Sequence, residues 1–372
     1  MAARLPRAVG ERATRHRGHG MITLRRRTDS RRTIPGTAEP GWSELCDVLG
    51  HVLPDGAHDP PIELERLKSR VYRLRTAGAS FVAKRYDPWL ARRNELVLQK
   101  WLPALRLDDR APRLVAAAAE RHGTTVWHVY EDLGETALDP ARPDPQQVGA
   151  VVDLIAELHL RGAGHAVVPE CRHFCGSLGA SFFVANIRDA IGVLEALAPP
   201  HVQATAEQGE LRGRLLGHLY RLRDDLPQRV ALLESLGGPD TVLHGDLWTT
   251  NTLLCHSGNG GGPVATSRLI DWDHAAVGPI SYDLSTFLFR FAKPERSWIL
   301  DLYRRAVARA GWKLPATQDL NTLFETAEYA RYANRIIWPA VALLKDGAAW
   351  GFDQLAEVER WFNALEPALP EL

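Results

Sequence analysis

Residues 243–251 have the sequence Leu-His-Gly-Asp-Leu-Trp-Thr-Thr-Asn, and this stretch decides the fold. It begins at the end of a short apolar run that predicts a β-strand leading into a loop. Asp246 and Asn251 stand five positions apart in that loop. Another acidic residue, Asp271, leaves a second short predicted strand at 267–270. The sequence therefore predicts two strand-to-loop junctions that present two carboxylates and one amide.

These three side chains match the needs of phosphoryl transfer. That reaction needs a carboxylate to accept or orient the attacking hydroxyl, and divalent cations to neutralise the phosphate oxygens. Mg²⁺ binds one or two carboxylates together with phosphate and water oxygens. We therefore assign Asp246 as the catalytic base, and Asn251 and Asp271 as the ligands of Mg²⁺.

The whole pattern resembles the aminoglycoside phosphotransferase and choline kinase group of small-molecule kinases, which are relatives of protein kinases. The H-G-D-x-x-x-x-N loop is similar to the H-R-D-x-x-x-x-N loop of protein kinases, and Asp271 takes the place of the D-F-G aspartate. The resemblance covers roughly residues 60–290 in order. It implies a two-lobed, protein-kinase-like α+β fold, and transfer of the γ-phosphoryl of ATP or GTP, with Mg²⁺, to a hydroxyl of a small molecule.

The resemblance also implies a phosphate-binding lysine on the third strand of the first lobe. Lys84 fits, because it lies in the strand-like run 80–86. Glu95 lies on the next predicted helix, which Pro88 opens. In kinases such a pair holds the α- and β-phosphates. Lys84 and Glu95 are thus predicted to bind the nucleotide, and the alternative is that both are solvated surface charges.

Two further signals complete the predicted nucleotide site. The turn at 66–72 contains no glycine, so Ser69 is the candidate for contact with the phosphate oxygens. The segment 129–134 resembles the kinase hinge, whose backbone reads the adenine edge, and Glu131 and Leu133 mark it. An ordinary edge strand that enters a turn is the alternative for this segment.

The predicted secondary structure agrees with two lobes. Up to residue 134 the pattern is β-β-β-α-β-β, and beyond it long helical periodicities dominate. We predict a small antiparallel β-sheet lobe with one helix, and a larger, mainly helical lobe. The predicted parts are a basic tail at 1–40, an N-terminal nucleotide-binding lobe at 41–134 ending in the hinge, and a C-terminal lobe at 135–372 with the catalytic loop and the acceptor site.

Charge is distributed unevenly along the chain. The formal net charge is zero, yet residues 1–32 carry ten arginines and two acids, which leaves −8 for the rest. We interpret the basic segment as a disordered tail, and Met21 as a second candidate start. The longest apolar stretch, 336–344, is too short to cross a membrane. We expect a cytoplasmic monomer or homodimer with neither a nucleic-acid nor a membrane partner.

The sequence leaves the acceptor open. The negative charge outside the tail favours a cationic acceptor such as an aminoglycoside, amino sugar or amino alcohol. Asp301, Glu325 and Glu328 are candidates for contact with ammonium groups, although solvated surface carboxylates are the alternative. Trp298, Trp338 and Trp350 are candidates for the floor of a sugar or macrolide site, and the alternative is that they simply pack. Antibiotic resistance and a metabolic role are both compatible with this pattern.

Two rival functions compete with a small-molecule kinase. A protein kinase needs a long activation segment after the metal-binding aspartate, but only eleven residues separate Asp271 from Asp283. A metal-dependent phosphohydrolase is the rival from another class. Its two metals would be held by a cluster of histidines and aspartates, namely His244, Asp246, Asp271, Asp273 and His274.

Overall fold

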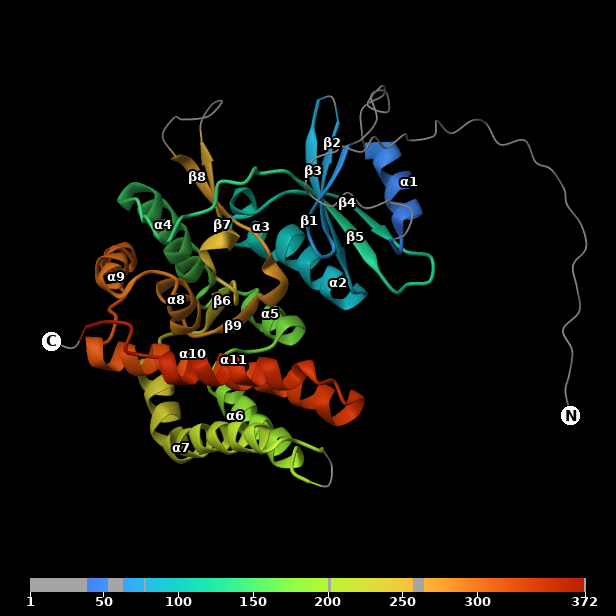
Figure 1. Cartoon of the computed structure of the whole chain (residues 1–372). Helices are drawn as coiled ribbons and strands as arrows, with labels where there is room; N and C mark the ends of the chain where they lie inside the picture. Colours follow the sequence, from blue (N-terminus) through green and yellow to red (C-terminus); the bar gives the residue numbers. More distant parts are fainter. Residues whose placement is uncertain (1–38, 53–62, 77, 200–201, 257–263, 371–372) are drawn as a thin grey trace, which may run out of the picture. The chain divides into compact units, whose positions relative to one another are not determined.

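The chain divides into two compact units. One contains the residues up to Asp87 together with Val115–Tyr130, and the other contains Pro88–Leu114 and Glu131–Leu372. The computed structural model (Figure 1) describes residues 39–52, 63–76, 78–199, 202–256 and 264–370. Most of the predicted basic tail lies outside the described residues. The predicted lobe boundary at residue 134 stays a prediction.

A five-stranded sheet with the order β1-β2-β3-β5-β4 forms the first unit. Its strands are β1 (Glu63–Lys68), β2 (Val71–Arg75), β3 (Ser80–Tyr86), β4 (Leu114–Ala119) and β5 (Val126–Glu131). β2 pairs antiparallel with both β1 and β3, and this register places Val71 opposite Lys84. Alternation along β5 buries Trp127 and Val129 in one core with α1 (Trp42–Val52). The predicted antiparallel N-terminal sheet is confirmed.

Helices dominate the second unit, which confirms the predicted helical C-terminal region. They are α2 (Pro88–Leu96), α3 (Leu102–Ala104), α4 (Pro145–Gly162), α5 (Val168–Cys175), α6 (Ala180–Ala196), α7 (Ala206–Leu236), α8 (Ser281–Leu288), α9 (Lys293–Ala308), α10 (Thr317–Asp346) and α11 (Trp350–Ala364). α4 begins where the sequence dictates, because the Asp144 side chain accepts the amides of Gln146 and Gln147 at 3.0 and 2.9 Å. The sequence pattern does not predict α5, since eight residues are too few to show helical periodicity.

Four short strands of the second unit form two separate antiparallel pairs. β6 (Thr241–Leu243) pairs with β9 (Ala276–Gly278), and β7 (Thr252–His256) pairs with β8 (Val264–Leu269). Because the second pair lies between the strands of the first in sequence, the loops 244–251 and 270–275 leave neighbouring strand ends. The sequence pattern predicts β6, β7 and β8 but not β9, because three residues show no alternation.

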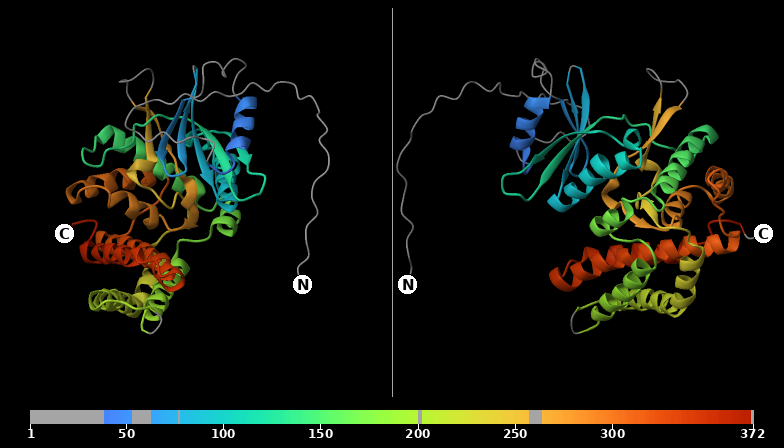
Figure 2. Two further views of the ribbon diagram at one scale, coloured as in Figure 1. Left: turned by 45° about the vertical axis from the view of Figure 1, so that its right-hand side comes forward. Right: turned by 180° about the vertical axis from the view of Figure 1, so that it is seen from behind.

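Two large apolar cores lie in the described part of the second unit. One gathers around α4, α8 and α9, and it also takes one side chain from each of the four short strands. The other lies among α6, α7, α10 and α11, which Figure 2 shows packed against one another. The strands that lead into the predicted catalytic loops are thus anchored in the first core. No helix in the described part of the chain is long and apolar enough to span a bilayer.

The contact between α4 and β6 gives a prediction on stability. A Cβ on Gly162 would lie 2.8 Å from the Val242 amide nitrogen and closer still to the Thr241 hydroxyl. We expect Gly162→Ala to lower the free energy of unfolding by about 1–3 kcal/mol, because overpacking forces α4 away from β6. Urea denaturation followed by circular dichroism measures this change.

Gly149, on the same helix, is the matched control. A Cβ there has no atom within 4 Å. Gly149→Ala should therefore leave stability unchanged or raise it by about 0.4–1 kcal/mol, since alanine restricts the unfolded chain. Equal losses in both variants would contradict the proposed close packing.

Candidate active site

Backbone hydrogen bonds join the two loops that carry the predicted site. The Ile270 amide donates to the Asn251 carbonyl at 3.0 Å, and His244 Nε2 donates to the Ile270 carbonyl at 2.9 Å. His244 Nδ1 in turn accepts the Asp246 amide at 3.3 Å. One ring nitrogen donates and the other accepts, so His244 orients the loop. The two predicted metal ligands are consequently carried by adjoining pieces of backbone.

Asn251 is fixed against Asp246 within the catalytic loop. Its Nδ2 donates to the Asp246 carbonyl at 2.8 Å and to the Asp246 carboxylate at 3.3 Å. Asn251 is only 5% exposed, whereas Asp246 is half-buried. Both bonds use the amide nitrogen, which leaves Oδ1 of Asn251, the predicted ligand atom for a cation. This donor chemistry fits Mg²⁺, which takes one or two carboxylates and fills its other positions with phosphate and water oxygens.

Asp271 adopts an unusual backbone conformation. Its φ of 66° and ψ of 57° lie in the left-handed region, which costs a residue with a side chain about 1–2 kcal/mol. The next residue, Trp272, is buried, donates its indole N–H to the Leu269 carbonyl at 3.0 Å and packs against the His244 ring. The surrounding packing thus holds Asp271 in a strained conformation, as is common at functional sites.

A buried carboxylate, Asp283, holds the start of the catalytic loop. Its two oxygens accept the amides of His244 and Gly245, each at 2.8 Å, and His159 Nε2 lies at 3.4 Å. Burial by itself would raise the pKa of Asp283. Hydrogen bonding and the nearby histidines outweigh it and hold the pKa below its ordinary value. Tyr303 extends the chain of contacts by bonding His159 Nδ1 at 2.9 Å.

Gly245 allows the two loops to approach each other. Its φ is +79°, a conformation that residues with a Cβ rarely adopt. A Cβ at this position would also overlap the His274 carbonyl group, at 2.7 Å from its carbon. The glycine of the H-G-D triplet is therefore required by backbone geometry on both counts.

Two side chains beside Glu95 contribute contacts that sequence reasoning missed. Arg93 donates to the Ala275 carbonyl, and Asn94 Nδ2 donates to Asp273 Oδ1 at 3.1 Å. Both residues lie on α2 and reach the loop that follows Asp271. An asparagine within a predicted helix is the only signal of these contacts that the sequence offers.

The predicted nucleotide-binding residues are distributed over both units. Ser69 lies in the turn between β1 and β2, and the Lys84 ammonium lies 4.7 Å from the centre of the Tyr86 ring. Both belong to the first unit. Glu95 belongs to the second, where its carboxylate lies 3.1 Å from Arg92. The pairing of Lys84 with Glu95 stays a prediction.

The predicted hinge is fixed by Glu131. Its carboxylate accepts the Arg113 amide at 2.9 Å and lies 2.5 Å from Arg268 Nη1. The Glu131 amide donates to the Arg113 carbonyl at 3.1 Å. Leu133 follows beyond the end of β5 and is half-buried. Whether this backbone reads a nucleotide base stays a prediction.

The histidine–aspartate cluster of the hydrolase alternative is not assembled. Within the described ranges, no three His, Cys, Asp or Glu side chains are arranged to hold a metal ion. His244 uses both ring nitrogens in hydrogen bonds, and Asp273 accepts from Asn94. This arrangement disfavours a two-metal hydrolase.

Comparison with known families decides the class of the protein. Residues 63–320 match the model described as "Phosphotransferase enzyme family". The chain belongs to this family. The predicted resemblance is confirmed, and so is the prediction that the chain is an enzyme of the kinase type. No curated protein sequence matches the chain.

Solved structures show the same fold at low sequence identity. An ethanolamine kinase from Plasmodium vivax has 14% identity and a TM-score of 0.53, covering 85% of this chain and 84% of its own. A macrolide 2′-phosphotransferase from Brachybacterium faecium has 18% identity and a TM-score of 0.50, covering 82% of this chain and 93% of its own. A spectinomycin phosphotransferase, in complex with ADP and spectinomycin, has 11% identity and a TM-score of 0.51, covering 83% of this chain and 90% of its own. The predicted kinase-like fold class is confirmed.

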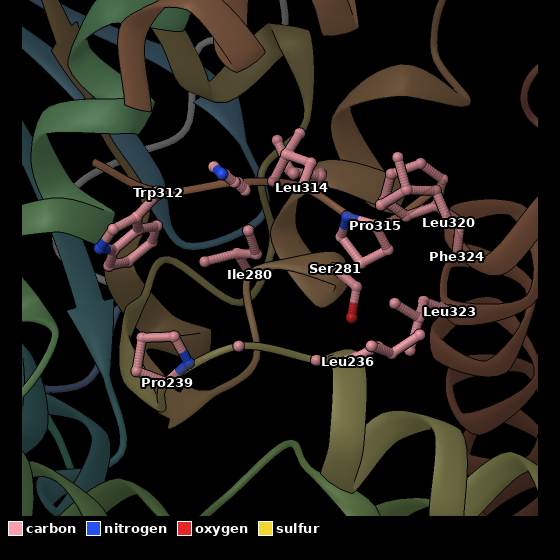
Figure 3. A pocket seen from close by; sticks show the side chains of 14 residues that line it. Leu236, Pro239, Ile280, Ser281, Trp312, Leu314, Pro315, Leu320, Leu323 and Phe324 are labelled. Atoms are coloured by element: carbon pink, nitrogen blue, oxygen red, sulfur yellow. The ribbon is translucent and has the colours of Figure 1, made fainter. Parts of the chain in front are cut away.

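An apolar cavity of about 210 Å³ lies beside the start of α8 (Figure 3). Ser281 lines it with a hydroxyl that is buried and has no hydrogen-bond partner. Its apolar walls come from the end of α7, from α8 and from α10 with the segment before it, as Leu236, Ile280, Leu284, Trp312, Leu314, Leu320, Leu323 and Phe324. None of the predicted site residues lines this cavity, so it is distinct from the candidate active site.

The bonds of Asp283 predict a large effect of its removal. Asp283→Ala leaves two buried amides and His159 without their acceptor, so we expect a loss of about 3–5 kcal/mol in the free energy of unfolding at neutral pH. The pKa of Asp283 is lowered in the folded chain, so its contribution is present above the ordinary carboxyl pKa and disappears as the pH falls through the lower folded value. The difference from wild type should therefore shrink below about pH 4.

Asp240 is the matched control for this measurement. It pairs with Arg172 at 2.6 Å, but both side chains are 44% exposed. Asp240→Ala should cost less than about 1 kcal/mol, because exposed ion pairs contribute little. Urea denaturation of both variants at neutral and acidic pH tests the difference. A loss for Asp283→Ala no larger than that of the control would contradict the anchoring role.

Proposed function

We propose that the protein is a small-molecule kinase that transfers the γ-phosphoryl of ATP or GTP to an acceptor hydroxyl beside Asp246. The observation that carries this proposal is the joining of two loops. Asn251 bonds Asp246 through its side chain and Ile270 through its backbone, and Ile270 is followed directly by Asp271. The acid, the amide and the second acid of the family pattern are thereby carried by neighbouring backbone, which supports the proposal.

In this mechanism Asp246 orients the acceptor hydroxyl and accepts its proton. The hydroxyl oxygen forms a bond to the γ-phosphorus, the bond from that phosphorus to the bridging oxygen breaks, and the nucleoside diphosphate leaves. Asn251 Oδ1 and Asp271 would hold Mg²⁺, which neutralises charge on the phosphate oxygens when bound. Asp246 lies on a loop fixed by Asp283 and His244, so the chain contributes mainly positioning.

The first unit and the predicted hinge would bind the nucleotide. Lys84, held by Glu95, would contact the α- and β-phosphates, and Ser69 would contact phosphate oxygens from the β1–β2 turn. The backbone at Glu131 and Leu133 would read the base. The ADP bound by the spectinomycin phosphotransferase supports nucleotide use by this fold. The named acceptors of the similar structures support an alcohol group on a small molecule.

A protein substrate is disfavoured by the chain that follows Asp271. A short helical turn at 272–274 leads into β9, and α8 begins at Ser281. The strand and the helix are buried, so this segment leaves no exposed platform on which a peptide could lie. A small acceptor fits this arrangement better.

The assignment of Asp246 gives a prediction on activity. Asp246→Ala should lower kcat by at least about 100-fold, because general-base catalysis contributes about 10²–10⁴-fold. Nucleotide affinity should stay unchanged, since Asp246 is assigned to the acceptor. Formation of the nucleoside diphosphate and titration calorimetry with ADP measure the two effects.

Thr250 offers a control in the same loop. Its side chain is exposed, and Thr250→Ala should retain wild-type turnover and nucleotide affinity. Wild-type turnover in Asp246→Ala would refute the assignment of the base.

The proposed metal ligands give a separate prediction. Chelation with EDTA should abolish turnover, and added Mg²⁺ should restore it. Asp271→Asn should raise the Mg²⁺ concentration needed for half-maximal rate by at least about tenfold, since even supporting groups contribute about 10–100-fold to metal affinity. Activity that is insensitive to EDTA would argue against a metal-dependent mechanism.

A further inference from the structure

Arg290 lies against the catalytic loop without serving any evident structural bond. It follows the end of α8, and its guanidinium lies 4.1 Å from the centre of the Trp248 ring. Trp248 is 38% exposed and stands two residues after Asp246, whose carbonyl accepts the Trp248 amide at 2.8 Å. Arg290 is also within electrostatic range of Asp246 itself. The pair therefore sits at the proposed base.

The hydrogen-bonding capacity of Arg290 is unused. Its Nε is buried without a partner, and in the described part of the chain no group accepts a hydrogen bond from its guanidinium. The two terminal nitrogens also have no partner among the described residues, but they are not fully buried, so they are accessible to solvent. Burial lowers the pKa of Arg290. The terminal N–H groups of Arg290 are therefore available to a ligand.

Arg331, which lies nearby, is by contrast fully engaged. It pairs with Glu328 and donates to the Thr286 hydroxyl and to the Tyr282 carbonyl, the last at 3.1 Å. These bonds lie within the fold, and the Arg331 guanidinium compensates the charge of Glu328. Arg331 and Glu328 thus compensate each other. In the described part of the chain Arg290 has no hydrogen-bonded carboxylate, and Asp246 is the carboxylate of the loop within its electrostatic range.

The carboxylates that the sequence offers to a cationic acceptor are all paired. Glu328 is 1% exposed and bound to Arg331, Glu325 lies 3.6 Å from Arg229, and Asp301 lies 2.5 Å from Arg304. Each of these acids lies beside an arginine, and their contact with ammonium groups stays a prediction. The unused hydrogen-bond donors beside Asp246 belong to a guanidinium, and they favour an acceptor that carries an oxyanion.

We propose that Arg290 and Trp248 form an acceptor subsite that binds an oxyanion, a carboxylate or a phosphate, on the same molecule as the reacting hydroxyl. The terminal nitrogens of a guanidinium form a planar fork that matches such a group with two parallel hydrogen bonds. Trp248 holds the fork by stacking against it and keeps its edge open. This inference rests on the proposed function, because it places the hydroxyl of the bound molecule beside Asp246.

A set of charge-matched probes tests the subsite on the full chain. D-glucuronate and D-glucose 6-phosphate carry the two oxyanions, D-glucose is neutral and D-glucosamine is cationic on the same ring. Glycerate, glycerol and 2-amino-1,3-propanediol form a smaller set. Titration calorimetry in the presence of ADP and Mg²⁺ should show an anionic probe binding at least about tenfold more tightly than its neutral counterpart, as expected for charge-assisted hydrogen bonds. Equal or weaker binding of every anionic probe would overturn the proposal. The carboxylate and phosphate members separate the two sources of the oxyanion.

Variants of Arg290 separate recognition from a structural role. Arg290→Gln should abolish the preference for the anionic probe, and Arg290→Lys should retain part of it, because lysine keeps the charge but not the fork. Arg360→Gln, at an exposed position on α11, should keep the wild-type preference. Thermal unfolding of each variant identifies any that fail to fold, and Arg290→Lys then decides the test.

The affinity for nucleotide distinguishes a second use of Arg290. If Arg290→Gln weakens ADP binding and leaves the anionic probe unaffected, the guanidinium serves the nucleotide and the proposal fails. With a turned-over probe, the variant should raise the KM of the acceptor at least about tenfold and leave the KM of ATP unchanged.

A failure of the proposed function would have a different signature. Asp246→Asn should lose turnover and keep the preference for the anionic probe. If the wild type shows this preference but consumes no ATP with any probe, the subsite stands and the kinase assignment fails.

Discussion

The carboxylate of Asp283 is the group on which the arrangement of the site depends. It is fully buried and accepts the two backbone amides that begin the catalytic loop. A buried charge is stable only when it is well bonded, and removal of either side leaves polar groups without partners. His159 and Tyr303 connect this carboxylate to α4 and α9, so the loop is tied to the core of the second unit.

The second constraint is the contact between the two strand-to-loop junctions. The bond from the Ile270 amide to Asn251 and the bond from His244 to the Ile270 carbonyl fix one loop against the other. They hold Asp271 in its left-handed conformation, and Gly245 permits the close approach. Phosphoryl transfer relies on positioned charge more than on reactive side chains, so a rigid backbone at this point is what the chemistry requires.

One helix, α8, connects both ends of the proposed chemistry. Asp283, in the first turn of α8, holds the loop just before Asp246. Arg290, just beyond the last turn of α8, lies over the ring of Trp248, two residues after Asp246. A ligand bound by Arg290 would therefore be aligned by the same element that positions the base. This arrangement gives a physical reason for an acceptor site on the second unit.

The sequence by itself determined the fold class, the order of the main elements and the family, because strand alternation, helical periodicity and the H-G-D-x-x-x-x-N spacing are local signals. It also singled out Asp246, Asn251 and Asp271, whose roles are proposed above. Only the tertiary structure decided which partners these residues meet. β9 is too short to leave a pattern in the sequence. Arg93 and Asn94 reach a loop about 180 residues away. The pairing of Glu328 with Arg331 and the open fork of Arg290 depend on side chains that packing brings together. Local sequence fixes what a segment prefers, but the charge left unpaired at a site depends on contacts between distant segments.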